Sequence, residues 1–443
     1  MKCGALFLLL AFAAIVNARV PVGSADPEGD LWVVLVAGSY TWFNYRHQAD
    51  VCHAYQIVHS HGVPDDHIIV MMYDDLATSK QNPTPGQVIN RPNGPDVYKG
   101  VPKDYIGMDV TPENFLKVLS GDAAGLEGVG SGKVVKSGPN DRVFVNLVDH
   151  GAPGIFAFPH TFMHAKDFSS TILQMKKDNK FKEMYVYMEA CESGSMFQNN
   201  FPDDIGFYAL SASNATESSY ACYMDTKRGT FLGDVFSIKW MEDSDREQLT
   251  KETLLEQFNI VQKSTTTSHV EQWGELSLDS NTVSTILGSK TPEGVVDPVI
   301  PSHDPCLNSS VSSPDVPVAI LQSNIDNAAN AGEAQMWQKQ LIKLHENRNL
   351  VNSITKKLAI EVTGDGEMAQ EMTTDKHHVI TQWDCYEQAA DAYNENCFNL
   401  GENPYALRAV HTLVNLCEHG HTASDIIAAT EKVCTHPHIT EIH

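Results

Sequence analysis

The sequence predicts an α/β domain built on a mostly parallel sheet flanked by helices, followed by a small all-α domain with disulfide bonds. Three apolar stretches are typical of buried strands, at residues 31–38, 142–151 and 183–191, and each is followed by a polar loop or a helical pattern. Four cysteines crowd the C-terminal end. With 443 residues, of which 42% are hydrophobic, the chain is long enough for two folded units.

The N-terminus has the pattern of a secretory signal. Lys2 precedes the apolar run "ALFLLLAFAAIV", and the small-residue exit Val16-Asn17-Ala18 predicts a signal peptide over residues 1–18. The run is too short to span a bilayer, and no other segment approaches about 18 consecutive apolar residues. The mature protein is therefore expected in the secretory pathway, without a membrane segment.

The remaining elements follow in order along the chain. Further strands are expected at 65–75 and 205–213, and a helix at 49–62 ends in a glycine stop. A loop rich in Pro and Gly, residues 76–107, is longer than most connections in compact domains, which indicates a functional role. Residues 288–318 are rich in Pro, Ser and Asp, which predicts a linker, and amphipathic helices are expected beyond it.

The charge balance excludes one class of partner. The chain has 31 Lys and Arg against 56 Asp and Glu, a net charge of −25. Phosphates would be repelled, so neither a nucleic acid nor an anionic membrane is expected as a partner.

The C-terminal cysteines predict two disulfides, because clustered cysteines in a secreted chain are usually paired. The cluster consists of Cys385, Cys397, Cys417 and Cys434. Zinc is the alternative, since "CEHGH" and "CTHPH" repeat a Cys-x-His-x-His pattern, but this spacing matches no common zinc finger. We therefore predict neither a metal nor another cofactor.

Two further features of the chain concern covalent chemistry. No partner for Cys306 is evident, so it is expected to be a free thiol or to link two chains. Asn214 and Asn308 each open an N-glycosylation sequon.

Two reactive side chains follow two of the buried strands. Cys191 ends the stretch 183–191, and His150 ends the stretch 142–151. In open α/β sheets the ligand crevice lies outside the carboxyl ends of the strands, so the two are expected to meet there as nucleophile and base. The backbone N–H groups of Gly151 and Cys191 could hold a developing oxyanion. The alternative is a small buried cysteine and an ordinary core histidine.

Several motifs along the chain resemble one family. They are "YRHQADVCHAYQ", "MMYDD", "INRPNG", "DHGAPG", "EACESGSM", "ESSYAC" and "LGDVFS". Together they are similar to the legumain family, asparaginyl endopeptidases with a caspase-like fold. The resemblance implies a signal peptide (1–18), a catalytic domain (19–288), a linker or activation peptide (289–327) and a helical prodomain (328–443). It implies that Cys191 is the nucleophile, that His150 is the base, and that Asn44 orients His150.

The same resemblance implies a pocket specific for asparagine. Its members would be Arg46, His47, Glu189, Ser218 and Asp234. An asparagine side chain offers a carbonyl acceptor and an amide donor, so a cation on one side and carboxylates on the other would recognise it. Aspartate is expected as a second substrate at low pH, because its protonated side chain offers a similar donor and acceptor.

We expect a zymogen whose helical domain caps the site and is released by acid and self-cleavage. Asn324 and Asn327, just after the linker, are the expected cleavage points. Nine histidines of the C-terminal domain would gain charge on acidification, and interface carboxylates would lose theirs, so docking should weaken. The partners implied are protein and peptide substrates, the chain's own prodomain and cystatin-type inhibitors. The implied location is a lysosome or another acidic endocytic compartment, or the cell exterior.

Two other functions remain open from the sequence. An asparaginyl transpeptidase or ligase would use the same residues, with an amine replacing water in the second step. A non-enzymatic secreted binding protein would be expected to lack the nucleophile or the base, and both are present.

Overall fold

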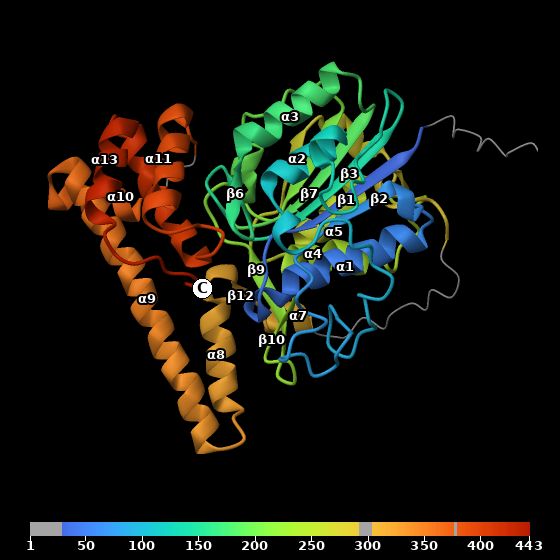
Figure 1. Cartoon of the computed structure of the whole chain (residues 1–443). Helices are drawn as coiled ribbons and strands as arrows, with labels where there is room; N and C mark the ends of the chain where they lie inside the picture. Colours follow the sequence, from blue (N-terminus) through green and yellow to red (C-terminus); the bar gives the residue numbers. More distant parts are fainter. Residues whose placement is uncertain (1–28, 292–303, 376–378) are drawn as a thin grey trace, which may run out of the picture.

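A six-stranded sheet forms the centre of the larger part of the molecule (Figure 1). The computed structural model describes residues 29–291, 304–375 and 379–443, so the predicted signal peptide lies outside the described residues. In spatial order the strands are β11 (Glu271–Gly274), β8 (Phe207–Ser211), β7 (Glu183–Glu189), β3 (Arg142–Val148), β1 (Leu31–Ala37) and β2 (Ile68–Met71). All neighbours pair in parallel except β11, which is antiparallel to β8. The predicted mostly parallel sheet is thus confirmed.

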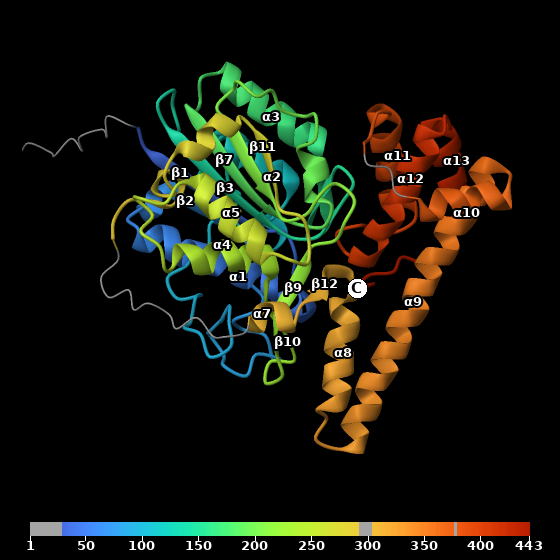
Figure 2. The same ribbon diagram turned by 180° about the vertical axis from the view of Figure 1, so that it is seen from behind.

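Helices cover both faces of this sheet (Figures 1 and 2). On one face lie α1 (Tyr45–Ser60), α4 (Val235–Ser244) and α5 (Leu254–Ser264), and on the other α2 (Pro112–Ser120) and α3 (Ala165–Lys177). Strand β1 shows why both faces must be covered. Val33 and Leu35 pack into the core under α1, whereas Val34 and Val36 pack into the core under α2 and α3.

Local signals in the sequence set the ends of these helices. Thr111 caps α2 by accepting a hydrogen bond from the Asn114 N–H, with Pro112 in the first turn. Thr253 and Glu256 form a capping box at the start of α5. Gly62, with φ of 93°, follows the end of α1, as the predicted glycine stop requires.

Two small antiparallel sheets lie beyond the carboxyl edge of the main sheet. One contains β4 (Gly151–Ala152), β5 (Ile155–Phe158) and β6 (Thr161–His164), and the other contains β10 (Thr230–Asp234), β9 (Tyr220–Asp225) and β12 (Val311–Ser312). Strand β12 comes from the predicted linker and pairs with β9.

The segment expected as a linker or activation peptide, residues 289–327, has regular secondary structure in its described part. From residue 304 onward it forms α7 (Pro305–Asn308), β12 and α8 (Val316–Asp326). Prolines 305 and 317 occupy first-turn positions, where a missing N–H costs nothing. Cys306 is neither a free thiol nor a link between chains, because it forms a disulfide with Cys222 on β9.

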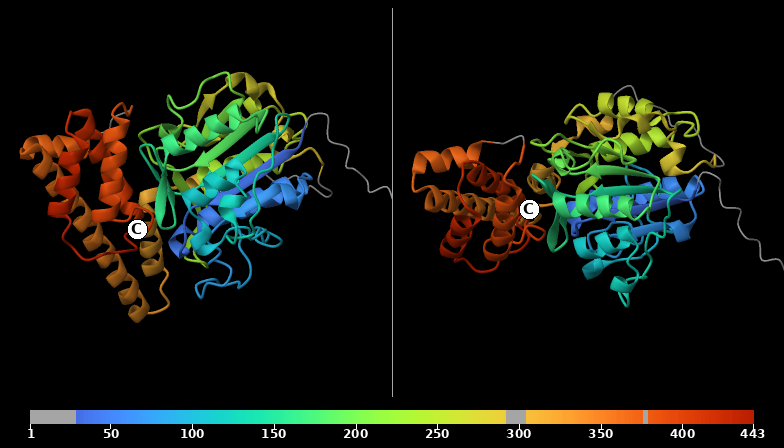
Figure 3. Two further views of the ribbon diagram at one scale, coloured as in Figure 1. Left: turned by 45° about the horizontal axis from the view of Figure 1, so that its top comes forward. Right: turned by 90° about the horizontal axis from the view of Figure 1, so that it is seen from above.

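The C-terminal domain is all-α, as predicted (Figure 3). Its helices are α9 (Ala331–Thr363), α10 (Gly366–Thr374), α11 (Trp383–Asn396), α12 (Val410–Glu418) and α13 (Ala423–Val433). Two disulfides, Cys385–Cys417 and Cys397–Cys434, join them, which confirms the predicted pairing of this cluster and removes its sulfurs from any zinc site. In the described residues we find no helix long and apolar enough to cross a membrane.

Candidate active site

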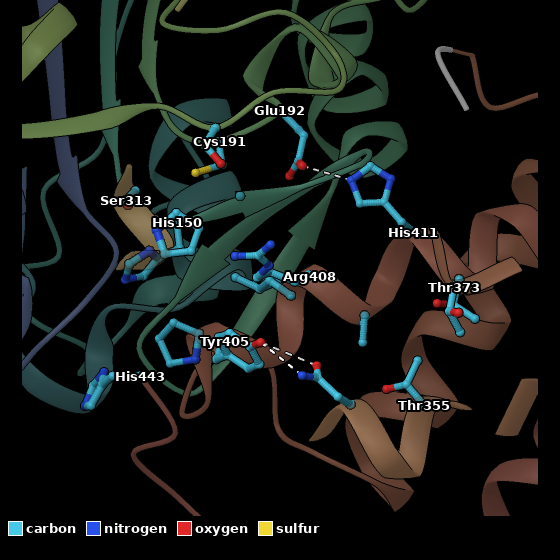
Figure 4. Close-up of a pocket in the computed structure, with 18 of the residues that line it drawn as sticks. His150, Cys191, Glu192, Ser313, Thr355, Thr373, Tyr405, Arg408, His411 and His443 are labelled. Atoms are coloured by element: carbon cyan, nitrogen blue, oxygen red, sulfur yellow. Dashed lines mark hydrogen bonds and ion pairs between the residues drawn. The ribbon is translucent and has the colours of Figure 1, made fainter. Parts of the chain in front are cut away.

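The two central strands bring His150 and Cys191 to one cavity. In the parallel pair β3 and β7, Val148 lies opposite Glu189, and each reactive residue follows its strand end by two positions. His150 and Cys191 both line a cavity of about 480 Å³ at this edge of the sheet (Figure 4). The predicted meeting of the two side chains at the carboxyl end of the sheet therefore agrees with the structure.

Asn44 fixes the histidine ring. Its Oδ1 lies 2.9 Å from Nε2 of His150, and its own Nδ2 donates to the Tyr40 carbonyl oxygen at 2.9 Å, which sets the amide orientation. Since Oδ1 can only accept, Nε2 must carry the proton, and Nδ1 is left with a free lone pair. Asn44 is the N-cap residue immediately before α1 and is buried.

Burial keeps both reactive groups neutral in this form of the chain. It raises the pKa of the Cys191 thiol to about 11, with the neighbouring Glu192 adding to the effect. Burial, with Arg46 and His443 nearby, holds the pKa of His150 well below its ordinary value. Sγ of Cys191 lies 3.8 Å from the Ser219 hydroxyl. The site as it stands is thus a thiol and a neutral imidazole rather than an ion pair.

The backbone around the thiol is unusually close and strained. A Cβ on Gly151 would lie 2.3 Å from the Cys191 carbonyl oxygen, so no other residue fits at this position. Glu192 adopts φ of 51°, a left-handed conformation that costs a non-glycine residue free energy and is concentrated at functional sites. These two features place the backbone of the 151 turn directly against that of Cys191.

Arg46 is the only cation among the five predicted pocket residues that is charged at every physiological pH. Its side chain is 1% exposed, and its Nε donates to Oδ1 of Asp234 at 2.8 Å. Its Nη2 donates to the hydroxyl of Ser313 at 2.8 Å. Ser313 comes directly after β12, so a residue of the predicted linker occupies one donor of the pocket cation.

Four buried carboxyl groups form one electrostatic cluster with this single guanidinium, centred on its partner Asp234. They belong to Asp50, Asp149, Glu189 and Asp234. Burial raises the pKa of each one, and in Asp234 the charge of Arg46 opposes that rise. One cation cannot neutralise four anions in a low-dielectric interior, so part of this cluster holds protons at neutral pH.

Four oxygens of this cluster are buried without a hydrogen-bond partner in the described residues, and two of them belong to Asp149. Oε2 of Glu189 accepts from the backbone N–H and the hydroxyl of Ser237, at 3.0 and 3.1 Å. Within the described residues, Oε1 of Glu189 and Oδ2 of Asp234 are buried without a hydrogen-bond partner. Ser218 lines the cavity of Cys191, whereas Glu189 and Asp234 are not among its lining residues. Buried acceptors without a partner are rare in proteins, which indicates that a ligand supplies the hydrogen-bond donor here.

His47 completes the floor of the site. Its Nδ1 lies 2.6 Å from the Ser39 hydroxyl and 3.1 Å from Oδ1 of Asp149, and its ring meets that of His150 edge-on at 4.9 Å between centroids. Burial lowers its pKa well below the ordinary value. His47, Asp149 and His150 each offer one ligand atom, and these atoms lie within 4.8 Å of one another. Nε2 of His150 is engaged by Asn44, whereas its Nδ1 is free within the described part of the chain.

The helical domain covers the site. His411 of α12 pairs with Glu192 at 2.8 Å, and both side chains are nearly buried. Arg408 extends into the cavity (Figure 4). The Tyr386 hydroxyl donates to the Pro153 carbonyl oxygen, and His443 lies beside Phe43, with ring centroids 5.0 Å apart.

Further side-chain pairs flank this cover, on the β5–β6 hairpin and at the start of α3. His160 pairs with Glu402 at 3.1 Å, His164 with Asp391 at 3.0 Å, and Lys166 with Asp384 at 3.0 Å. Here the basic side chains belong to the sheet domain and the acidic ones to the helical domain, and the two histidines are charged only when protonated.

Other predicted positions lie away from this cavity. Asn324 is half-buried within α8, and Asn327 is exposed at the end of that helix. Asn308 is exposed at the end of α7. Oδ1 of Asn214 accepts from the Thr216 N–H at 2.9 Å, and the Asn214 backbone lies against Gly194, close behind Cys191.

Sequence reasoning missed three residues that shape the site. Ser313 lies in the stretch whose Pro, Ser and Asp content predicted a linker, so nothing marked it as a site residue. His443 has no local sequence pattern around it. Asp50 could have been found, because it lies four positions after Arg46 on α1. Its Oδ1 accepts a hydrogen bond from Nδ2 of Asn90 at 2.7 Å. The long 76–107 loop, which contains Asn90, therefore supports the pocket.

Comparison with known proteins agrees with this geometry. Residues 31–289 match the profile described as "Peptidase C13 family", and residues 339–434 match "Legumain, prodomain". Legumain of Mus musculus is 49% identical over 420 residues, 94% of this chain and 95% of that protein. Legumain of Homo sapiens is 45% identical over 432 residues, 97% of this chain and 98% of that protein. Hemoglobinase of Schistosoma mansoni is 38% identical over 411 residues, 92% of each. This chain therefore belongs to the peptidase C13 family and carries a legumain prodomain.

Proposed function

We propose that this chain is the zymogen of a cysteine endopeptidase that cuts peptide bonds after asparagine, and after aspartate at low pH. One observation carries the choice of residue: the Arg46 guanidinium lines the cavity of Cys191, and its buried partner Asp234 interacts electrostatically with the buried Glu189. Arg46 would donate to the asparagine carbonyl, while Glu189 and Asp234 would accept from its amide. A side chain without these groups would leave the pocket's polar atoms unpaired, which predicts strong rejection of leucine or alanine.

The residues at the strand ends supply the chemistry. Sγ of Cys191 would attack the carbonyl carbon as Nδ1 of His150 takes the thiol proton, because Asn44 holds the proton on Nε2. The N–H groups of Gly151 and Cys191 would hold the oxyanion. His150 would then protonate the leaving amine, and water would hydrolyse the acyl-enzyme with His150 as base. Asn44 acts as a positioning residue in this sequence.

The helical domain would inhibit this reaction in the uncut chain. It buries Cys191 and His150 and thereby favours their neutral forms, and it closes the cavity that a substrate must enter. Its departure would return water to the site, lower the pKa of the thiol and raise that of the imidazole. Self-cleavage after Asn324 or Asn327 would remove the covalent link, so that the helical domain can dissociate.

Compartment and further partners follow from the same features. The disulfides indicate the secretory pathway, and carboxyl groups that favour their protonated forms suit an acidic endocytic compartment such as the lysosome. Protein and peptide substrates would enter the uncovered cavity, and a cystatin-type inhibitor would bind there if it presents an asparagine on a loop. The sequons at Asn214 and Asn308 would carry glycans.

Glu189→Gln tests the pocket. The carbonyl oxygen of the Gln would still accept the two hydrogen bonds from Ser237. Its NH2 group would replace Oε1 and face the amide of the substrate asparagine, so that two hydrogen-bond donors meet. An unsatisfied buried N–H costs about 1–3 kcal/mol, so kcat/KM for asparaginyl peptides should fall about 5- to 150-fold. The ratio of aspartyl to asparaginyl cleavage should rise, since an amide donor suits a carboxylate.

The matched control is Glu252→Gln, a buried glutamate outside the cavity whose pKa burial raises to about 9. Kinetics would be measured at acid pH on peptides that differ only in the residue before the cut. An unchanged ratio of aspartyl to asparaginyl cleavage in Glu189→Gln would contradict the pocket assignment. Analysis of products with an added amine would show whether transfer accompanies hydrolysis.

A further inference from the structure

The segment from Asp304 to Ser313 is anchored on the sheet domain, whereas the residues after it contact both domains, since α8 packs along α9 and Arg348 of α9 donates to the Pro314 carbonyl oxygen. Cys306 is fully buried and bonded to Cys222 of β9. Lys239 of α4 pairs with Asp304, and the Ser309 hydroxyl accepts from the Tyr223 N–H at 2.9 Å. These contacts do not involve α9–α13, so departure of the helical domain leaves them in place.

The middle of the segment occupies the pocket as a bound strand would. Val311 and Ser312 pair with Ala221 and Tyr220, and the Ser313 N–H donates to the Ser219 carbonyl oxygen at 2.9 Å. The Ser313 hydroxyl then takes the Nη2 donor of Arg46. Ser313 lines the cavity of Cys191 (Figure 4). Pro314 is also part of the cavity lining.

The start of α8 holds this strand from the other side. Val316 and Ile320 form a small apolar cluster with Ala221 and Phe231, and Phe43 packs against it. A cut after Asn324 or Asn327 separates α8 from α9 but removes none of these contacts. Strand pairing, the Arg46 hydrogen bond and this cluster all remain on the protease side of the cut.

We infer that residues 304–326 are a second inhibitory element, held at the substrate pocket by the Cys222–Cys306 disulfide after the helical domain has left. This inference rests on the proposed function, because it assigns Arg46 to substrate recognition. A dithiol reductant would release the element by thiol–disulfide exchange. Two electrons and two protons pass to the cysteine pair, and the reductant becomes a disulfide. Full activation would then need a reductive step as well as a cut.

The effect of the disulfide follows from the length of the tether. From Cys306 to Ser313 the tether is about seven residues, whereas without the disulfide it runs about 23 residues from Lys290, whose N–H is fixed by the His61 carbonyl oxygen. Effective concentration falls roughly as the −3/2 power of tether length, so losing the disulfide should weaken this internal competitor about sixfold. A competitor raises KM and leaves kcat unchanged.

The test compares the double variant Cys222→Ala/Cys306→Ala with the wild type, both cut at acid pH and freed of the helical domain. Cys385→Ala/Cys417→Ala, which removes a disulfide of the departed domain, is the control. KM for an asparaginyl peptide should be about sixfold lower in the double variant, with kcat unchanged. The rate of Cys191 alkylation, mapped by mass spectrometry, should rise in parallel.

Ser313→Ala provides a second test in which the disulfide stays intact. Loss of a hydrogen bond to a charged group should lower KM about tenfold or more, and this variant does not disturb the buried disulfide. Equal KM and equal alkylation rates in wild type, Ser313→Ala and the double variant would overturn the inference. If none of the proteins cleaves an asparaginyl peptide, the proposed function fails, and the alkylation rates alone decide whether the segment covers Cys191.

Discussion

His443 should act as an acid sensor for docking of the helical domain. Its imidazole is 8% exposed and lies between Phe43 and two guanidinium groups, those of Arg348 and Arg46. Within the described residues its Nδ1 is buried without a partner. Burial, with Arg348 and Arg46 adding to it, lowers the pKa of His443 to about 4. Release of the domain returns the ring to water, where a histidine has a pKa near ~6.5.

The sign of the effect follows from this lowered pKa. The docked state binds the neutral ring, so the contribution of His443 to docking is complete above about pH 6.5 and is lost as pH falls toward 4. One unit of pKa difference is about 1.4 kcal/mol, and acidification from pH 7.5 to pH 5 therefore costs about 2 kcal/mol. That weakens docking about 30-fold at pH 5.

His443→Phe removes the charge and keeps an aromatic ring beside Phe43. The Arg348 Nε donates to the backbone oxygen of residue 443, so that bond is retained. After cutting at acid pH and alkylation of Cys191, the fragments would be returned to pH 7.5 and titrated downward, with docking followed by sedimentation. The Phe variant should release its helical domain at a lower pH and bind about 30-fold more tightly at pH 5.

His419→Phe, at an exposed position of the same domain, is the control and should release like the wild type. The reasoning is refuted if His443→Phe and the wild type dissociate at the same pH. It is also refuted if the release pH of His419→Phe differs from that of the wild type as much as the release pH of His443→Phe does.

Three further outcomes are expected. Cys191→Ser should abolish turnover while Cys52→Ser, a buried thiol outside the cavity, retains it; activity after selective alkylation of Cys191 would contradict this. Mass spectrometry should find the first cut after the exposed Asn327 rather than after Asn324, which lies inside α8, and a dominant Asn324 product would show that the helix does not protect it. The cut enzyme should lose thermal stability as pH rises above about 4, because buried carboxyls with raised pKa, such as Glu189, bind protons more tightly folded than unfolded; a melting temperature that climbs from pH 5 to pH 8 would be inconsistent.

Local patterns predicted the sheet because its strands are buried on both faces. The apolar runs at 31–38, 142–151 and 183–191 coincide with β1, β3 and β7 to within a few residues. The stretch 65–75 was overestimated, since Asp65–His67 forms a 3₁₀ turn and the strand ends at Met71. Residues Asp74 and Asp75 beyond it are engaged by side-chain hydrogen bonds instead.

Only part of the site could be predicted from the sequence. His150 and Cys191 follow from strand ends, and the pocket residues follow from resemblance. Ser313, His411 and His443 reach the cavity by docking of distant segments, which leaves no periodic signal. The disulfide of Cys306 spans 84 residues, so composition around it suggested a linker while its partner lay in β9.

The direction of α8 bears on the kinetics of activation. The helix starts at the cavity, where Pro317 is part of the lining, and runs outward for 11 residues, about 16 Å, to the turn that carries Asn327 (Figure 1). A molecule therefore cannot bring its own Asn327 to its own Cys191 while α8 stays folded in place, and a second molecule must make the cut. Maturation then becomes a bimolecular chain reaction. Its progress curve should be sigmoidal, with a lag that shortens with concentration and disappears when a trace of mature enzyme is added. A dilute precursor would stay dormant even in acid, and an accumulated store would convert abruptly.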